Sequence, residues 1–259
     1  MNNLFIEKNI CRTCDSKNIK LVKKMNPVAI AGPNTGIKDK NSKGITTNEL
    51  IPLSLYICNS CLNLQINETI YPEILYRNFK YTTSITHGLI DHFDSFANDK
   101  LINNEVSIDD FVLDIGSNDG SLLAAFKKIG CKVLGVEPAT KLADKVNKQG
   151  LNTIPEFFCE KLAKKIVLKF GIPKLIVCNN TLANIDNLND FIKGIEILTD
   201  SKTVVYVETQ YGMDVLERML IDTIYHEHLN YFTIHSLDKL LLKFNLYINN
   251  VEHLENKGG

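Results

Sequence analysis

Short apolar runs alternate with amphipathic segments in the central part of the chain, between residues 111 and 209. The runs are short enough to be buried strands, and they lie at 111–116, 132–137, 174–180 and 203–209. The segments between them carry apolar residues at helical spacing, which predicts helices over 121–130, 139–150, 158–171 and 189–198. Strands that alternate with helices indicate an α/β fold, in which a parallel sheet is covered on both faces.

The ends of the first two strands carry residues that we expect to bind a ligand, because ligands of such sheets bind beyond the carboxyl ends of the strands. The first strand runs into DIGSNDGS, where Gly116 and Gly120 allow a tight turn and close approach of a ligand. Asp114 and Asn118 supply polar groups in the same loop. The second strand ends at Glu137, 23 residues after Asp114, where a carboxylate can accept hydrogen bonds from both hydroxyls of a ribose. This spacing predicts a nucleoside site.

The composition of the glycine loop distinguishes between two nucleoside cofactors. A dinucleotide-binding loop reads G-x-G-x-x-G, and the loop G-S-N-D-G lacks the second glycine that lets a pyrophosphate approach. Asp and Asn side chains suit a cationic ligand that carries an amino acid better than they suit a pyrophosphate. We therefore expect S-adenosylmethionine (SAM), with its sulfonium and ammonium charges, rather than NAD. The alternative is that Gly116 and Gly120 are turn residues only.

Composition and charge limit the classes of function. The chain has 259 residues, of which 44% are hydrophobic, so it can bury a sizeable core in one or two domains. The formal charge is −1, from 29 basic and 30 acidic residues, which does not favour a nucleic-acid partner. The sequence has no apolar run near the ~18 residues of a spanning helix and no signal-peptide core at its start. We therefore expect a cytoplasmic protein with no membrane partner.

Four of the seven cysteines form two Cys-x-x-Cys pairs, Cys11/Cys14 and Cys58/Cys61. Two such turns can supply the closed tetrahedral shell of thiolates that holds structural zinc. The 43 residues between the pairs exceed the usual zinc-ribbon spacing, and they include a loop-like run at 31–44 that can bulge out. The alternative is two unrelated thiol pairs, one of them redox-active. We expect the isolated cysteines to be small buried side chains: Cys131, Cys159 and Cys178.

Three segments together resemble one family of enzymes. DIGSNDGSLLAAFKKIGCKVLGVEPA is similar to the SAM-binding core of bacterial nucleotide-sugar C-methyltransferases, which act on NDP-4-keto-deoxysugars. CRTC and CNSC resemble the zinc-binding domain that is fused to this core, and DTIYHEHLNYFT resembles the segment with the catalytic base. The resemblance implies a zinc-binding domain over 1–75 and a Rossmann-like class I methyltransferase domain over 76–259, with a helical lead-in at 76–105.

The resemblance also implies contacts between SAM and residues that follow four strands. The full set is Asp114, Gly116, Asn118, Gly120, Glu137, Phe157, Phe158 and Asn179. The loop residues cradle the methionine part, the glutamate holds the ribose, and the two phenylalanines lie where the adenine is expected. Asn179 falls near the methionine end of the cofactor. Aromatic residues at 157 and 158 can equally belong to the core, so that alternative stays open.

The chain departs from the family pattern at three places. Asn184 stands where family members often carry a histidine, and an asparagine cannot act as a base. Leu62 follows the second cysteine pair where glycine is usual, which weakens the turn without removing a ligand. Family chains usually continue after a glycine pair like Gly258–Gly259 into a second α/β lobe, so the resemblance implies that this lobe is missing here.

The run YHEH at 225–228 groups four residues that can move protons or bind metal. Its histidines are two apart, whereas a zinc-protease helix needs H-E-x-x-H, and a two-histidine metal site on an extended segment is the weaker alternative. Proton transfer is favoured because histidine titrates near neutral pH. The resemblance implies that His228 is the base, that Glu227 orients a donor, and that Tyr225 and Tyr81 approach the sugar. We expect His226 to be structural.

The resulting prediction is a SAM-dependent C-methyltransferase that acts on carbon 3 of a nucleotide sugar through an enolate. A SAM methyltransferase with an oxygen or nitrogen acceptor is the nearest alternative. A non-catalytic SAM- or nucleotide-binding protein is a third possibility, because the second lobe is missing. A zinc-ribbon protein that modifies RNA is disfavoured by the near-neutral charge.

Overall fold

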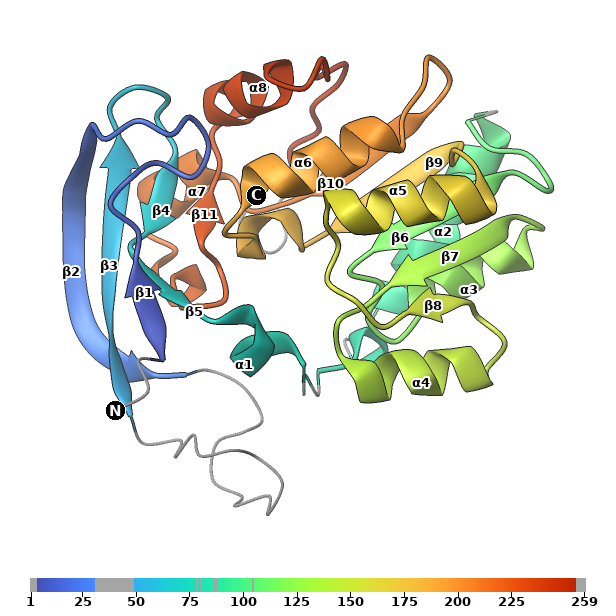
Figure 1. Ribbon diagram of the computed structural model, residues 1–259, viewed down its shortest axis with the longest axis horizontal. Coiled ribbons are helices and arrows are strands. Elements are labelled where there is room, and N and C mark those ends of the chain that lie inside the picture. The colour runs from blue at the N-terminus through green and yellow to red at the C-terminus, as the bar shows by residue number, and fades with distance from the viewer. Residues whose placement is uncertain are drawn as a thin grey trace. The chain divides into compact units, whose positions relative to one another are not determined.

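The computed structural model describes residues 4–30, 49–77, 79, 81–85, 88–103 and 105–254. The loop-like run at 31–44 and the glycine pair at 258–259 lie outside the described residues. The chain divides into two compact units, and it passes from one to the other after Leu75, Leu182, Asn189 and Glu208. The first unit contains the chain up to Leu75, the segment Ala183–Asn189 and the chain from Thr209 onward, and the second unit contains the rest. Figure 1 shows the elements of both units.

The second unit is built on a parallel sheet of five strands in the order β10-β9-β6-β7-β8. The strands are β6 (Phe111–Ile115), β7 (Lys132–Val136), β8 (Thr153–Ile154), β9 (Leu175–Asn179) and β10 (Val204–Glu208). The first strand in the chain lies in the centre, and successive strands extend the sheet to one side and then to the other. This is a doubly wound α/β arrangement, which confirms the predicted α/β class with a Rossmann-like parallel sheet.

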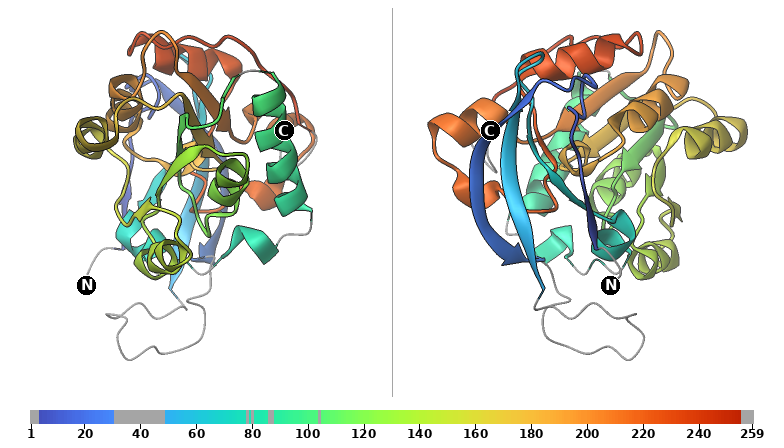
Figure 2. Two further views of the ribbon diagram at one scale, coloured as in Figure 1. Left: turned by 90° about the vertical axis from the view of Figure 1, so that its right-hand side faces the viewer. Right: turned by 60° about the vertical axis from the view of Figure 1, so that its left-hand side comes forward.

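Helices cover both faces of this sheet, as the alternating pattern predicted (Figures 1 and 2). They are α2 (Leu89–Ile102), α3 (Ser121–Lys128), α4 (Thr140–Lys148), α5 (Glu160–Phe170) and α6 (Leu188–Ile197). Residues Phe93 and Ala97 of α2 and Phe126 of α3 form one core cluster with Val112 and Val177 of the strands. These two helices therefore bury their apolar stripes against the same face of the sheet.

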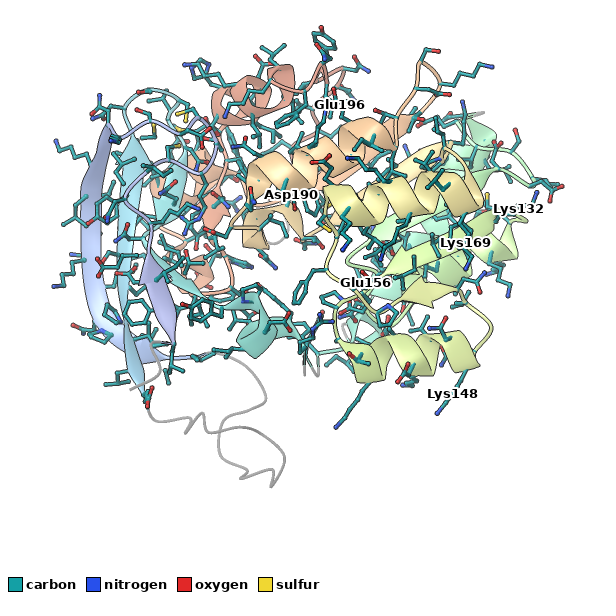
Figure 3. The ribbon with its side chains drawn as sticks, in the orientation of Figure 1. Lys132, Lys148, Glu156, Lys169, Asp190 and Glu196 are labelled. Atoms are coloured by element: carbon teal, nitrogen blue, oxygen red, sulfur yellow. The ribbon has the colours of Figure 1, made fainter. Side chains whose placement is uncertain are left out.

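Helix α5 shows how the sequence pattern produces this packing. Leu162, Ala163 and Ile166 share one side of the helix and are buried, whereas Lys169 is exposed. Other exposed charges of this unit include Lys132, Lys148 and Glu156 (Figure 3). Among the expected buried cysteines, Cys131 and Cys178 are buried as predicted, whereas Cys159 is half-buried.

The first unit contains antiparallel sheets only, among the residues described. Its four-stranded sheet has the order β11-β4-β3-β2, with β2 (Ile19–Ala29), β3 (Leu50–Cys58), β4 (Leu64–Ile66) and β11 (Asn230–Tyr231). A two-stranded sheet pairs β1 (Phe5–Glu7) with β5 (Glu68–Ile70), and the short helix α1 (Pro72–Tyr76) follows it. The first unit also contains α7 (Gly212–Glu217), η3 (Ile221–Thr223) and α8 (Ile234–Leu242). The short helix η1 (Thr83–Ile85) belongs to the second unit, and η2 (Leu182–Asn184) lies where the chain passes from the second unit to the first.

The core of the first unit is shared between its amino-terminal and carboxyl-terminal segments. Leu55 and Leu64 cluster with Val215, Leu229 and Tyr231, all of them buried. Strand β11 extends the sheet by pairing with β4, so the YHEH segment, between η3 and β11, is anchored to this sheet. No helix in the described part of the chain is long and apolar enough to cross a membrane.

Candidate functional site

The loop after β6 has a backbone that only glycine accommodates at two positions. Gly116 has φ +84°, and a Cβ atom there would lie 2.1 Å from the Thr181 hydroxyl oxygen. Gly120 has φ +76°, and its Cβ would lie 2.8 Å from a methyl carbon of Val146. Glycine is therefore required at both positions, by the backbone conformation and by the lack of space for a Cβ atom. The tight geometry that the sequence predicted for this loop is present.

Two carboxyl groups are buried beside this loop, at the ends of the first two strands. Asp114 is 4% exposed and Glu137 is 5% exposed. The pKa of Asp114 is raised to about 8. Burial is the larger cause, and the negative charge of Glu137 is the smaller one. Burial also raises the pKa of Glu137, although its carboxylate accepts hydrogen bonds from the backbone N–H of Asn118 (2.9 Å) and of Ala139 (2.7 Å). Such a pair gains free energy from a neighbouring cation.

The side chain of Asn118 holds a neighbouring segment against the loop. Its Oδ1 accepts from the backbone N–H of Thr83 at 2.8 Å, and its Nδ2 donates to the Tyr81 carbonyl at 3.1 Å. Asp119 Oδ2 accepts from the backbone N–H of Ser84 at 2.8 Å. The segment that carries Tyr81 is thus tied to the predicted cofactor loop. The side-chain amide of Asn118 therefore has a structural role. Its contact with SAM remains a prediction.

The two phenylalanines expected near the adenine have different surroundings. Phe158 packs edge-on against Phe191 with 5.0 Å between ring centroids, and it fills the space beside Gly194. This contact is a core contact, in line with the alternative that the sequence left open. Phe157 is half-buried, and the guanidinium of Arg77 lies 4.5 Å from its ring centroid.

Two further features lie close to these positions in the second unit. Arg77 Nη1 donates to the carbonyls of Pro138 and Pro155 at 3.2 Å each, so it ties together the turns that follow Glu137 and β8. No motif or periodic pattern in the sequence pointed to Arg77 as a residue of this region. Asn179 ends β9, and its carbonyl accepts from the Thr181 hydroxyl at 3.2 Å. The roles of Asn179, Phe157 and Phe158 in cofactor binding stay predictions.

His228 lies within a set of hydrogen bonds that determines its tautomer. Its Nδ1 is 2.9 Å from the Thr223 carbonyl, which can only accept, so Nδ1 carries the proton. Nε2 then carries a lone pair and accepts from the Tyr225 hydroxyl at 2.9 Å. Burial lowers the pKa of His228, and the bond to the Thr223 carbonyl opposes this effect. The ring is therefore neutral at pH 7, with its basic nitrogen facing Tyr225.

The other members of YHEH also have environments that change their acidity. Burial raises the pKa of Glu227 to about 7. Burial raises the pKa of Tyr225 to about 12, and the charge of Glu227 contributes in the same direction. His226 is buried, and its Nε2 donates to the Pro52 carbonyl at 2.8 Å, in keeping with a structural role. Groups with shifted pKa values gather at sites of proton transfer.

The four paired cysteines form one cluster in the first unit. Their Sγ atoms lie within 4.8 Å of one another, with Cys11 to Cys61 at 3.5 Å and Cys14 to Cys58 at 3.6 Å. Three of the four thiols are fully buried. Hydrogen bonds from Cys61 and then from Thr13 lower the pKa of Cys11, against the effect of burial. The two unrelated thiol pairs of the alternative interpretation would not need to converge in this way.

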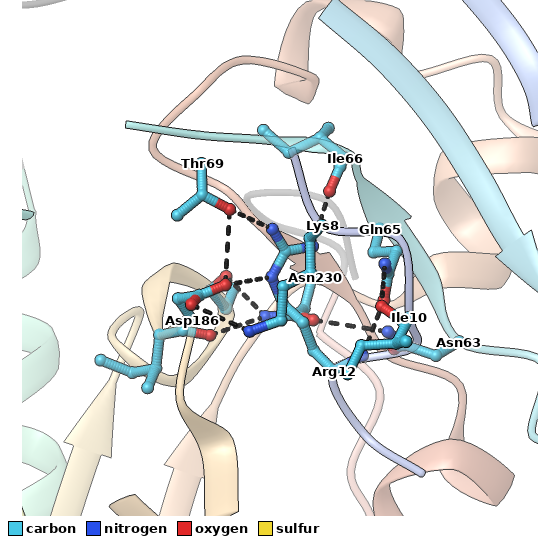
Figure 4. A network of polar contacts seen from close by, with 11 residues as sticks. Lys8, Ile10, Arg12, Asn63, Gln65, Ile66, Thr69, Asp186 and Asn230 are labelled. Carbon is cyan, nitrogen blue, oxygen red and sulfur yellow. Dashed lines mark hydrogen bonds and ion pairs between the residues drawn. The ribbon is translucent and has the colours of Figure 1, made fainter. Parts of the chain in front are cut away.

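A network of polar contacts surrounds the CRTC turn (Figure 4). The fully buried guanidinium of Arg12 donates to Asp186 and to the Ile66 carbonyl, and Lys8 also pairs with Asp186. The Asn230 amide donates to the Ala183 and Ile185 carbonyls at 3.3 and 3.0 Å. The segment 183–189, which carries Asn184, is thereby fastened to the sheet of the first unit. The sequence pattern did not predict this network.

The chain belongs to the methyltransferase domain family, whose model it matches over residues 98–251. It is 28% identical over 249 residues to the C-methyltransferase NovU of Streptomyces niveus. This match covers 96% of the present chain and 58% of NovU, so the chain spans little more than half of that relative's length.

The chain is also similar to parts of several solved structures at low sequence identity. One is the cyclopropane synthase MmaA2 from Mycobacterium tuberculosis, with 15% identity, a TM-score of 0.49, and coverage of 68% of this chain and 66% of that chain. Another is a SAM-dependent methyltransferase from Archaeoglobus fulgidus, with 12% identity, a TM-score of 0.47, and coverage of 60% and 68%.

Proposed function

We propose that the chain is a SAM-dependent C-methyltransferase that methylates carbon 3 of an NDP-4-keto-deoxysugar. The observation that carries this proposal is the neutral imidazole of His228, whose tautomer is set by Thr223 and whose Nε2 is a free base. The saturated carbon beside a ketone becomes a nucleophile after it loses a proton to form an enolate, so its methylation needs a base of this kind. The likeness to NovU, whose name describes a C-methyltransferase, supports the same chemistry.

The residues of the second unit suit SAM, which supplies an electrophilic methyl group on a positively charged sulfur. Asp114 and Glu137 are buried carboxyl groups with raised pKa values, and a cationic ligand would favour their ionised forms. Glu137 keeps lone pairs for ribose hydroxyls beside the two backbone bonds that it accepts. Gly116 keeps the loop free of side-chain atoms where the cofactor is expected to approach.

In the proposed reaction, His228 Nε2 removes the proton from the sugar carbon beside the ketone, and the electron pair of that C–H bond forms the enolate. Tyr225 turns its hydroxyl away from Nε2 and toward the sugar, with its proton retained because its pKa is raised to about 12. SAM, when bound, would supply the methyl group to the enolate carbon, and the electron pair of its broken S–CH₃ bond would stay on sulfur as a neutral thioether.

We further propose that Cys11, Cys14, Cys58 and Cys61 hold a structural zinc ion. Tetrahedral zinc with Zn–S bonds of about 2.3 Å separates its sulfurs by about 3.8 Å. The observed Sγ–Sγ distances of 3.5 and 3.6 Å fit this shell after a slight expansion. Four thiolates leave no open position for a substrate, so the ion would stabilise the fold only.

The replacement of His228 by Asn tests the proposed function. The variant loses the base but can keep its place in the turn, so we expect methyl transfer to fall by about 10²–10⁴-fold. SAM affinity, measured by calorimetry, should stay within a factor of about three, because the hydrogen bonds of the His228 ring go to Thr223, Tyr225 and Gln210 and to none of the predicted cofactor residues. His235→Asn, an exposed histidine in α8, is the matched control and should keep full activity.

A panel of NDP-keto-sugars, monitored by the mass of one added methyl group, identifies the acceptor. Exchange of the sugar proton in deuterated water, with S-adenosylhomocysteine in place of SAM, measures enolate formation alone. Methyl transfer without exchange, or an active His228→Asn variant, would contradict carbon methylation through this base. Transfer to an oxygen or nitrogen acceptor would favour the alternative enzyme.

A further inference from the structure

Gln210 is a buried residue beside His228 that the sequence did not point to. It follows β10 and is 5% exposed. Its Nε2 lies 3.3 Å from His228 Nε2, and its Oε1 has no hydrogen-bond partner in the described part of the chain. A buried amide oxygen without a partner destabilises the folded chain, because it has given up its hydrogen bonds to water. A residue that keeps such an atom next to a general base calls for an explanation in the chemistry of that base.

Proton uptake by His228 changes what its neighbours must offer. In the resting tautomer, Nε2 accepts from Tyr225 at 2.9 Å and faces the amide N–H₂ of Gln210. Once Nε2 carries a proton it becomes a donor, and a facing N–H₂ group then repels it. A half-turn about the last side-chain torsion of Gln210 exchanges its nitrogen and oxygen positions, and this torsion is a soft one.

We propose that Gln210 is a positioning residue that serves both protonation states of His228. Its amide donates to the neutral ring, and after a half-turn its Oε1 accepts from the imidazolium. The inference rests on the proposed function, since it needs His228 to take up a proton. The substrate proton ends on His228 Nε2 and its electron pair goes to the enolate, while the rotation of the amide moves no proton.

Four other residues in the described structure lie around His228 or next to it in the chain, and each has a defined relation to the ring. Thr223 offers its carbonyl to Nδ1, Tyr225 offers its hydroxyl to Nε2, and the ring of Tyr231 lies 6.4 Å away at its edge. Glu227, the adjacent residue, has its pKa raised to about 7 by burial. Tyr225 can also turn and accept, so the contribution of Gln210 is best separated in a Tyr225→Phe background.

The test is the titration of the His228 ring by NMR in the full chain, with its signals assigned by their loss in His228→Asn. Gln210→Met keeps the length of the side chain but neither donates nor accepts. If the amide switches, the variant deprives the imidazolium of a charge-assisted bond, and the proton affinity of His228 falls roughly 3- to 10-fold. If Gln210 only donates, the neutral form loses its partner and the proton affinity rises instead.

Gln210→Glu provides a second, independent variant, and its acceptor charge should raise the proton affinity of His228 by about tenfold or more. Gln149→Met, at an exposed position after α4, is the control and should change nothing. An unchanged or raised affinity in Gln210→Met, alone or in the Tyr225→Phe background, overturns the inference, as does an unchanged affinity in Gln210→Glu. The titration needs no methyl transfer, so it separates a failure of this inference from a failure of the proposed function.

Discussion

Arg12 Nε and Asp186 Oδ1 lie 2.9 Å apart, although 174 residues separate them in the chain. The arginine side chain is fully buried, and the aspartate side chain is 27% exposed. Arg12 stands between two cysteines of the predicted zinc site, and Asp186 stands in the segment that follows η2. The ion pair therefore connects the metal-binding turn to a segment that returns to the first unit from the parallel sheet.

Asp186→Asn should destabilise the chain by about 3–5 kcal/mol, because it leaves a buried guanidinium without its counter-charge. Urea unfolding of the full chain, read by circular dichroism, measures this loss. The matched control is Asp15→Asn, which removes an ion pair between Asp15 and Lys243 that is also 2.9 Å long but has side chains 52% and 32% exposed. That pair should be worth about 1 kcal/mol or less. Equal losses in the two variants would contradict the assigned role of burial.

The second cysteine turn carries a residue that its backbone disfavours. Leu62 has φ +62°, the left-handed conformation, which costs a non-glycine residue about 1–2 kcal/mol. Leu62→Gly should therefore stabilise the turn, with an increase of roughly 1 kcal/mol in the free energy of unfolding after the added entropy of glycine is subtracted. Thermal unfolding in the presence of zinc and the rate of zinc loss to a chelator measure the effect.

Leu62→Ala is the control for that change, because it removes the same 48%-exposed side chain but keeps the strained backbone. It should give no gain in stability. If alanine stabilises as much as glycine does, exposure of the leucine rather than the backbone is the source of the effect.

The apolar runs predicted the parallel sheet well because its central strands, β6 and β9, are almost entirely buried. The expected strands 111–116 and 132–137 end within one residue of β6 and β7. The glycines of the predicted cofactor loop could also be predicted, because Gly116 and Gly120 have positive φ angles that favour glycine at these positions. These features depend on local periodicity and local conformation.

Polar contacts between distant segments had no such signal. Gln210 follows a predicted strand, at a position where polar residues are expected, yet nothing in the sequence indicates that it faces His228. The same holds for the Thr223 carbonyl, which sets the tautomer of that histidine. The engagement of the Asn118 amide with the segment around Tyr81 likewise follows from tertiary structure alone.

Gly116 provides both a positive φ and space for a close neighbour. A comparison with a glycine that provides only a positive φ separates these two effects. Gly116→Ala places a Cβ atom at a left-handed position and 2.1 Å from the Thr181 hydroxyl oxygen. We expect the cofactor loop to shift and SAM affinity to fall at least about tenfold, since the backbone can no longer hold its approach to the ligand. Calorimetry with SAM measures this change.

Gly171→Ala is the matched control, because Gly171 has φ +85° and nothing lies within 4 Å of a Cβ atom there. Its ψ of −170° puts it in a backbone region that almost only glycine adopts, so the change should cost about 1–3 kcal/mol of stability and leave SAM affinity unchanged. A Gly116→Ala variant that binds SAM as tightly as the Gly171→Ala variant would show that the loop does not hold the cofactor.

Asp114 should make both stability and cofactor binding depend on pH. Its pKa is raised by burial to about 8 in the folded chain, from an ordinary value of 3.8. Between these values the folded state holds a proton that the unfolded state has lost, so stability falls as pH rises through the window and levels off above pH ~8. The slope contributed by one such group is about 1.4 kcal/mol per pH unit. Asp114→Asn should flatten the curve in urea unfolding between pH 5 and 8.

The same carboxyl group predicts a release of protons when SAM binds. A cationic ligand favours the ionised form of Asp114, so binding at pH 7 should release up to about one proton per chain. Calorimetry in phosphate and in Tris, whose ionisation enthalpies differ, measures this release as a difference in apparent binding enthalpy. Asp114→Asn should reduce the difference and bind SAM more weakly. Equal enthalpies in both buffers for the unmodified chain would mean that Asp114 keeps its proton, and the cation would then not lie near it.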